Sequence, residues 1–291
     1  MKFTLVAGTG NNFALFDCFA EEPPNDPRQV ALELCGAALA SRAQLDANLS
    51  PDFRLDGILL LTRPREGGDC RMVIYNSDGS RPESCGNGLR CIALVARERE
   101  YVHSDEFTIE TDSGLRRARV LRDKRHASGI SGAEIHMGEP RIVERRVTLK
   151  TGHGAVEATI IDMGNPHCVL FARDEREAPV ARLGAELERH RHFPARTNVE
   201  FVTVHPEGLQ MRVWERGVGE TAACGTGACA AAVAAVITNR ASTPIDVKLA
   251  GGTLRITWDA PDGEVRLSGA CEVLGSGELL PATQLLRENG A

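Results

Sequence analysis

Short runs of apolar residues, many with the two-residue period of a β-strand, alternate along the chain with a few longer runs. The strand-like runs cover residues 2–6, 13–19, 57–61, 71–76, 107–111, 115–121, 155–162, 168–171, 199–204, 209–215, 245–249 and 253–258. Asp112-Ser113-Gly114 and Gly251-Gly252 join neighbouring runs and predict hairpins. The pattern therefore predicts a strand-rich α+β protein.

Three longer segments predict helices. Asp26 followed by Pro27 is a cap and first-turn signal, and it opens a segment that continues to about residue 44. A second segment, residues 86–100, has one apolar face, formed by Leu89, Ile92, Ala93 and Ala96. The third, residues 225–239, is apolar on every side, which predicts a helix buried all round. The polar stretch 122–131 is the predicted linker.

An internal repeat links the two halves of the chain. Residues 71–91 align without a gap on residues 210–230, and both segments contain Cys-Gly-x-Gly, at 85–88 and at 224–227. A second echo matches Gly-Asn-Asn-Phe at 10–13 with Gly-Asn-Pro-His at 164–167. These two echoes, in the same order, predict two homologous, pseudo-symmetric halves. Packed face to face, such halves would oppose Cys85 and Cys224 across a cleft.

Composition narrows the functional classes. The 291 residues leave room for one large domain or two ordinary ones, and the net charge of −6 without a basic run gives no case for a nucleic-acid or membrane partner. No apolar stretch reaches the ~20 residues of a membrane span, and the N-terminus lacks a signal-peptide pattern. The nine cysteines show no CxxC and no zinc-type spacing. We therefore expect a cytoplasmic protein with reduced thiols and no metal.

The two Cys-Gly-x-Gly motifs suit proton transfer at a carbon. One cysteine can act as thiolate base and the other as thiol acid, and the two can exchange roles. Each precedes a helix, where free N–H groups lower a thiol pKa and bind anions. A substrate α-carboxylate held there gains negative charge as its Cα proton leaves, so the site favours the transition state. We therefore expect an amino-acid epimerase.

Polar residues at nearby turns complete the candidate site. These are Asn11, Asn76, Asn165, Asn198, His167 and the pair Glu215-Arg216. Each alone is typical of a turn, a structural histidine or a solvated surface, but together they could hold an amino acid. Neither motif ends in the Gly-Lys-Ser/Thr of a phosphate loop. None of the four lysines lies beside a motif, which disfavours a pyridoxal phosphate enzyme, so no cofactor is expected.

Five segments carry a family resemblance: GTGNNF (8–13), YNSDGSRPESCGNGLRC (75–91), GNPH (164–167), RTNVEFV (196–202) and WERGVGETAACGTGACA (214–230). They resemble the diaminopimelate epimerase family of cofactor-independent, two-cysteine racemases. The resemblance implies proton transfer by Cys85 and Cys224, and pKa tuning by His167 and Glu215. It implies substrate binding by Asn11, Asn76, Asn165, Asn198, Glu215 and Arg216, with an α-carboxylate cradle at Gly86, Asn87, Gly225 and Thr226.

The resemblance also implies a fold and a role. Each half would curl a mixed sheet or barrel around a central helix, with residues 1–125 plus 275–291 forming one half and residues 126–274 the other. The reaction would interconvert LL- and meso-diaminopimelate, for lysine and peptidoglycan-precursor synthesis, and the resemblance leaves room for a homodimer. The chain departs from the family pattern at Ala7, at Asn12 and along residues 48–57, where only Asp56-Gly57 is kept.

Other functions stay open at this point. Proline, hydroxyproline or histidine could be the epimerised amino acid, although Arg216 with Asn76 and Asn198 favours a substrate with a distal carboxylate. A thiol–disulfide oxidoreductase is disfavoured because the chain lacks CxxC. A binding protein without catalytic activity is disfavoured, because binding alone needs neither cysteine.

Overall fold

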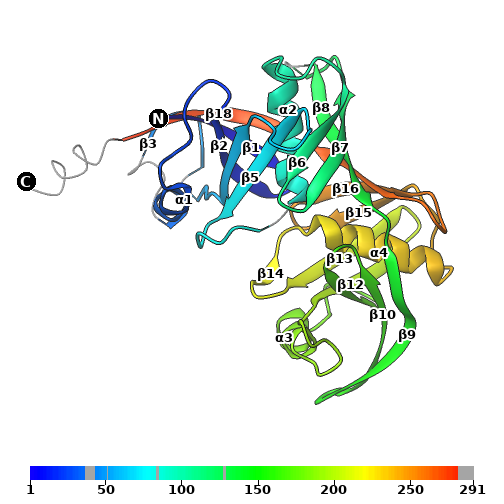
Figure 1. Ribbon diagram of the computed structural model, residues 1–291. Coiled ribbons are helices and arrows are strands. Elements are labelled where there is room, and N and C mark those ends of the chain that lie inside the picture. The colour runs from blue at the N-terminus through cyan, green and yellow to red at the C-terminus, as the bar shows by residue number, and fades with distance from the viewer. Residues whose placement is uncertain (37–42, 51, 83–84, 127–128, 281–291) are drawn as a thin grey trace, which may run out of the picture. The chain divides into compact units, whose positions relative to one another are not determined.

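The computed structural model describes residues 1–36, 43–50, 52–82, 85–126 and 129–280 (Figure 1). The described chain is a strand-dominated α+β fold with few helices, as predicted. It divides into two compact units, Met1–Ile135 with Ala270–Ala291, and His136–Gly269. Among the described residues, the strands of neither unit close into a barrel.

The first unit is one mixed sheet. Its strands are β1 (Lys2–Gly8), β2 (Asn11–Asp17), β3 (Ala43–Asp46), β4 (Gly57–Thr62), β5 (Cys70–Asn76), β6 (Glu106–Thr111), β7 (Gly114–Arg122), β8 (Ile130–Gly138) and β18 (Glu272–Leu279). They pair in the order β3–β18–β1–β2–β4–β5–β6–β7–β8. Because β18 pairs with β1, the last described strand returns to this unit. The stretch predicted as a linker connects β7 to β8, and the division into units falls within β8.

The second unit repeats this arrangement. Its strands are β9 (Arg141–Thr151), β10 (Gly154–Asp162), β11 (Pro166–Phe171), β12 (Asn198–His205), β13 (Gly208–Glu215), β14 (Gly219–Thr221), β15 (Ile245–Leu249), β16 (Gly252–Trp258) and β17 (Val265–Ala270). The order is β9–β10–β11–β12–β13–β15–β16–β17, with the short β14 also paired to β13. Two short helical segments, η2 (Val180–Gly184) and α3 (Ala185–Glu188), lie between β11 and β12 in the chain.

Each sheet curls around one long helix. In the first unit α2 (Gly86–Glu98) contacts β1, β4, β5 and β7, and in the second α4 (Gly225–Ile237) contacts β10 to β13, β15 and β16 (Figure 1). The predicted all-round burial of α4 is confirmed, since residues 227–235 are all buried. In α2 the predicted apolar face of Leu89, Ile92, Ala93 and Ala96 is buried, and the burial extends to all of residues 87–96, Arg90 included. Each sheet therefore packs around the central helix of its own unit.

The first helix is shorter than predicted. Helix α1 (Pro27–Gly36) begins as expected, with the backbone N–H of Gln29 donating to the Asp26 carboxylate at 3.0 Å. The predicted helix continued to residue 44, but β3 already begins at Ala43 and pairs with β18. Residues 37–42, which the prediction also covered, lie outside the described residues. Pairing with a strand from the far end of the chain thus replaces local helix propensity.

Strand register confirms the internal repeat. Strands β2 and β4 are parallel with Phe13 opposite Gly57, and β11 and β12 are parallel with His167 opposite Asn198. Tyr75 lies opposite Ile58 as Trp214 lies opposite Val199. Helix α2 follows β5, and α4 follows β13 after the short strand β14. The pairs of equivalent positions are therefore Phe13 and His167, Leu59 and Glu200, Asn76 and Glu215, Cys85 and Cys224, and Gly88 and Gly227.

Candidate active site

Cys85 is the N-cap residue of α2. Its backbone is extended, with φ −149° and ψ 114°, and its half-buried side chain accepts a hydrogen bond from the Gly88 N–H at 3.4 Å. The first N–H groups of a helix have no acceptor within the helix. A cysteine at this position therefore places its sulfur beside backbone donors, as the sequence motif predicts.

A hydrogen-bonded cluster supports the start of α2. The Asn87 amide donates to the Asn11 side-chain oxygen at 2.7 Å, which joins the helix to β2. Arg90, fully buried, donates to the Asn87 oxygen at 2.8 Å and to the Thr9 hydroxyl at 2.6 Å. The structure thus brings together Cys85, Asn87 and Asn11 of the predicted site.

The remaining predicted residues of this unit have local partners. The Asn76 amide donates to the Ser80 hydroxyl at 2.9 Å, so its side chain braces the turn after β5. Asn12, one of the departures from the family pattern, donates through its backbone to Asp56 at 2.8 Å and through its amide to the Arg54 carbonyl at 3.1 Å. The departures at residue 12 and in the segment 48–57 therefore lie in contact with each other.

Cys224 is the N-cap residue of α4 and is more deeply buried than Cys85. It has the same extended backbone, with φ −136° and ψ 110°, and only 6% of the residue is exposed. Its sulfur lies 3.6 Å from the Thr226 hydroxyl oxygen. Both units thus carry a cysteine at the equivalent helix position, and the Cys224 side chain is more deeply buried than that of Cys85.

The surroundings of Cys224 correct one expectation. The helix N-terminus was expected to lower the thiol pKa, but burial, followed by the charges of Glu215 and Glu200, raises the pKa of Cys224 well above its ordinary value. Hydrogen bonds from Thr226 and the Gly227 N–H act in the opposite direction and are weaker. Desolvation penalises the charged thiolate more than the helix terminus favours it. The surroundings of Cys224 therefore favour its neutral thiol over the thiolate.

Glu215 ends β13 beside this thiol. Burial raises the pKa of its carboxyl group, while hydrogen bonds from Thr221 and Cys224 lower it by less. The Thr221 hydroxyl donates to its Oε1 at 2.5 Å. Glu215 thus contacts Cys224 within the same unit, and its negative charge acts directly on that thiol.

Three more predicted residues form a chain to Cys224. Fully buried His167 has its Nε2 atom 3.0 Å from the Asn165 side-chain oxygen. The Asn165 amide donates to the Thr226 hydroxyl at 3.4 Å, and this hydroxyl is the partner of the Cys224 sulfur. His167 is therefore linked to the thiol through two side chains, those of Asn165 and Thr226.

Asn198 and Arg216 form a neighbouring cluster. The Asn198 oxygen accepts from the Arg216 backbone N–H at 2.9 Å, and its amide donates to the Pro166 carbonyl at 3.1 Å. The exposed Arg216 guanidinium donates to the Ala195 carbonyl at 3.2 Å. Asn198 thus fixes the backbone from which the Arg216 side chain extends, and that side chain is accessible to a substrate carboxylate.

The sequence interpretation missed two residues of these clusters, Arg90 and Glu200. Both are 0% exposed and both lie within apolar segments. Glu200 is hydrogen-bonded to His167, and the Oε1 atom of Glu200 lies 2.6 Å from the Nδ1 atom of His167. A charged residue inside an otherwise apolar strand or helix is the signal that could have identified them.

The second glycine of each motif is required by close packing. A Cβ on Gly227 would lie 2.8 Å from the Glu200 Oε1 atom and 3.3 Å from the Cys224 sulfur, whereas one on Gly88 would lie 3.0 Å from a Leu59 methyl. We expect Gly227→Ala to destabilise the protein by about 1–3 kcal/mol, because the hydrogen-bonded Glu200 cannot move aside. Urea unfolding measures this, with Gly152→Ala as control, since its Cβ would have an ordinary 3.7 Å contact. Equal stability of the two variants would contradict the expectation.

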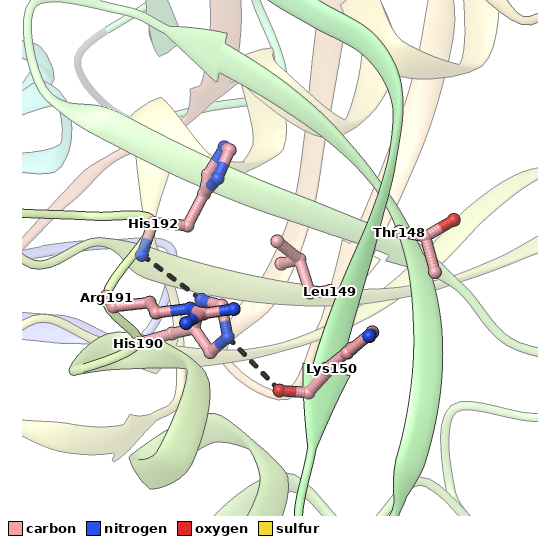
Figure 2. A pocket seen from close by; sticks show the side chains of 6 residues that line it. All are labelled: Thr148, Leu149, Lys150, His190, Arg191 and His192. Atoms are coloured by element: carbon pink, nitrogen blue, oxygen red, sulfur yellow. Dashed lines mark hydrogen bonds between the residues drawn. The ribbon is translucent and has the colours of Figure 1, made fainter.

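Two cavities lie on the second unit. One of about 370 Å³ is lined by residues 148–150 and 190–192, where His190 accepts from the His192 N–H at 3.2 Å (Figure 2). The other, of about 320 Å³, includes Pro166 and Ala195, the carbonyl partners of Asn198 and Arg216. The described residues contain no cluster of three or more potential ligands arranged for a metal ion. No helix among them has the length and apolar character of a membrane span.

Solved structures of similar fold support the architecture. A probable proline racemase from Agrobacterium radiobacter matches with a TM-score of 0.66 at 16% identity, over 96% of this chain and 92% of that one. A phenazine biosynthesis protein of the PhzF family from Bacillus anthracis matches with a TM-score of 0.71 at 12% identity, over 97% and 100%. At these identities the likeness concerns the fold.

Sequence comparison is more specific. The family model described as diaminopimelate epimerase matches residues 3–143 and 159–272. Diaminopimelate epimerase of Desulforudis audaxviator is 40% identical over 97% of this chain and 100% of its own length. That of Moorella thermoacetica is 38% identical over 92% and 95%. With both cysteine motifs inside the matched residues, the chain belongs to the diaminopimelate epimerase family.

Proposed function

We propose that the protein interconverts LL- and meso-diaminopimelate by moving the Cα proton between Cys85 and Cys224, without a cofactor. The observation that carries the proposal is the equivalence of these two residues. Each is the N-cap of the central helix of its unit, in the same extended backbone conformation, after an equivalent strand. Family membership supports diaminopimelate as the substrate.

In the proposed reaction a thiolate removes the Cα proton from one face and the other thiol protonates the opposite face. The substrate α-carboxylate takes the first N–H groups of the two helices, at Gly86, Asn87, Gly225 and Thr226. These donors face the charge that develops as the enediolate forms, so they stabilise the transition state more than the bound substrate. No redox step or group transfer is needed.

The two ends of diaminopimelate need different partners. The reacting end is assigned to the helix termini, and the distal carboxylate to Arg216, whose guanidinium is exposed and whose backbone is fixed by Asn198. Asn11, Asn76 and Asn165 supply further amides. A planar guanidinium meets a carboxylate with two parallel hydrogen bonds, which suits this role.

The cellular setting follows from the chemistry. An epimerase acting on diaminopimelate serves lysine and peptidoglycan-precursor synthesis, and we place it in the cytoplasm. A homodimer is included in the proposal because the family resemblance leaves room for one. Sedimentation equilibrium tests the assembly state independently of activity.

Substrate exchange tests the proposed function. The purified protein is incubated in deuterium oxide with LL-diaminopimelate, proline, hydroxyproline or histidine, and deuterium at Cα is followed by NMR. We expect exchange and epimerisation with diaminopimelate alone. Exchange with proline, hydroxyproline or histidine in place of diaminopimelate would keep the two-cysteine chemistry and refute the substrate. The absence of exchange with all four would refute the function.

A further inference from the structure

The two units differ in what lies behind their cysteines. In the second unit His167 and Glu200, both 0% exposed, form a hydrogen-bonded pair with 2.6 Å between Nδ1 and Oε1. The equivalent positions of the first unit hold Phe13 and Leu59, which are also buried. The same place in the fold is thus filled by apolar side chains in one unit and by an ionisable pair in the other.

Packing alone does not explain the ionisable pair. Burying a carboxylate costs free energy that its partners must offset, and Phe13 with Leu59 shows that apolar side chains fill this place. The second carboxylate oxygen of Glu200 is buried and finds no hydrogen-bond partner among the described residues. A costly group at this place points to a role in the chemistry.

A continuous chain of contacts joins Glu200 to the thiol. It runs from Glu200 to His167 at 2.6 Å, to Asn165 at 3.0 Å, to Thr226 at 3.4 Å and to the Cys224 sulfur at 3.6 Å. All of these residues belong to the second unit. Glu200 also lies directly against the first turn of α4, since its Oε1 atom occupies the space that a Cβ of Gly227 would need. Glu200 therefore reaches Cys224 both through hydrogen bonds and through its charge.

We propose that Glu200 is a positioning residue for proton transfer at Cys224: it fixes the orientation of His167 and, through Asn165 and Thr226, the thiol itself. The part that concerns the Cα proton rests on the function proposed above. The Glu200 carboxylate and the Asn165 side-chain oxygen are both acceptors, so each ring nitrogen of His167 faces an acceptor, Nδ1 at 2.6 Å and Nε2 at 3.0 Å. A buried carboxylate holds an imidazole in a fixed orientation in the same way in serine-protease triads.

The charge of Glu200 also sets the resting state of the site. Three ionisable groups from the strands beside α4 act here, namely Glu215 on β13, Glu200 on β12 and His167 on β11. Both carboxylates raise the pKa of Cys224, whereas the Thr226 hydroxyl lowers it. Burial and both carboxylates thus favour the neutral thiol of Cys224, which is the form that can donate a proton.

The test compares Glu200→Gln with wild type in three measurements. Peptide-resolved mass spectrometry follows alkylation of Cys224 against pH, with Cys18 of the first unit as internal reference, where burial raises the pKa to about 11. Nitrogen-15 NMR reports the protonated ring nitrogen of His167, and steady-state kinetics separate kcat from KM. We expect the Cys224 profile to move to lower pH, the Nδ1–H signal to shift, and kcat to fall by about 10- to 100-fold with KM changed little.

Three further variants, at two positions, make the outcome decisive. Glu110→Gln removes another buried carboxylate, which accepts from the backbone of Arg65 and Glu66 at 2.7 Å in the first unit, and should leave the Cys224 profile and kcat unchanged. Thr226→Val interrupts the series of hydrogen bonds between Glu200 and Cys224. Because Thr226 is half-exposed, this variant should fold, and it provides the test if Glu200→Gln does not fold. It should move the Cys224 profile to higher pH and lower kcat, with Thr226→Ser restoring both.

The proposal is overturned if Glu200→Gln leaves the Cys224 profile and the His167 signal unchanged, or if both change while kcat stays within about threefold of wild type. It is also overturned if Thr226→Val shifts the profile in the same direction as Glu200→Gln. Alkylation and NMR need no substrate. A wild-type protein that fails to epimerise diaminopimelate would therefore refute the proposed function while the chain to Cys224 is still tested.

Discussion

Replacing Cys85 or Cys224 with alanine is expected to lower epimerisation in both directions by about 10²- to 10⁴-fold or more, because each direction needs one base and one acid. Neither variant should unfold the protein. Each cysteine caps the start of a helix, and the helix residues that follow it, 87–96 in α2 and 227–235 in α4, are buried. The measurement is the rate of conversion of LL- to meso-diaminopimelate and of the reverse reaction.

Matched controls are available in the same helices. Cys91 of α2 and Cys229 of α4 are both buried, and their alanine variants remove a thiol from the same helix without touching the proposed chemistry. We expect both to keep near wild-type turnover. Serine at position 85 or 224 should retain proton exchange on one face, since the remaining thiolate can still remove a proton there. Wild-type turnover by Cys85→Ala in both directions would refute the two-base mechanism.

Arg216→Met is expected to weaken diaminopimelate turnover by about 2–5 kcal/mol in kcat/KM, the cost of removing one partner of a water-excluded charge pair. The fold should tolerate the change, because the side chain is exposed and donates to a backbone carbonyl, that of Ala195. Arg216→Lys should recover only part of the loss, since an ammonium is a point charge without the two-pronged geometry.

The control is Arg255→Met, which removes another arginine of the second unit, ion-paired to Asp246 at 3.0 Å. We expect this variant to behave as wild type. The loss in Arg216→Met should fall on diaminopimelate and spare any exchange seen with amino acids that lack a distal carboxylate. If Arg216→Met stays within about threefold of wild type, or ~0.65 kcal/mol, Arg216 is not the distal anchor.

Several features could be predicted from the sequence because they depend on short stretches of chain. A helix apolar on every side can only be stable when buried, so α4 was predictable from residues 225–239 alone. The two Cys-Gly-x-Gly motifs fix their cysteines at helix starts, because an N-cap is a local conformation. The repeat was visible because both units conserve the strand, turn and helix around these motifs.

Other elements depended on partners far along the chain. Strand β3 was mistaken for the end of a helix, and it forms because β18 supplies its hydrogen bonds. Strand β9 was missed because it is mostly exposed, with only Leu149 buried, and it forms by pairing with β10. Arg90 lies on the buried part of α2, which the apolar positions of the segment did not indicate, because contacts with distant strands bury residues 87–96. Local propensity gives no weight to hydrogen bonds and burial that come from distant strands.

The same distinction separates the parts of the site. The sequence by itself identified the two cysteines, their helix termini and the polar residues at the turns, since each is marked by residue type and spacing. Only the tertiary structure joined Glu200 to His167, across 33 residues of sequence, and raised the pKa of Cys224. The sequence interpretation predicted a lowered thiol pKa because helix dipoles can be read from a motif. Desolvation and the approach of two carboxylates exist only after folding, and at Cys224 they outweigh the hydrogen bonds from Thr226 and the Gly227 N–H.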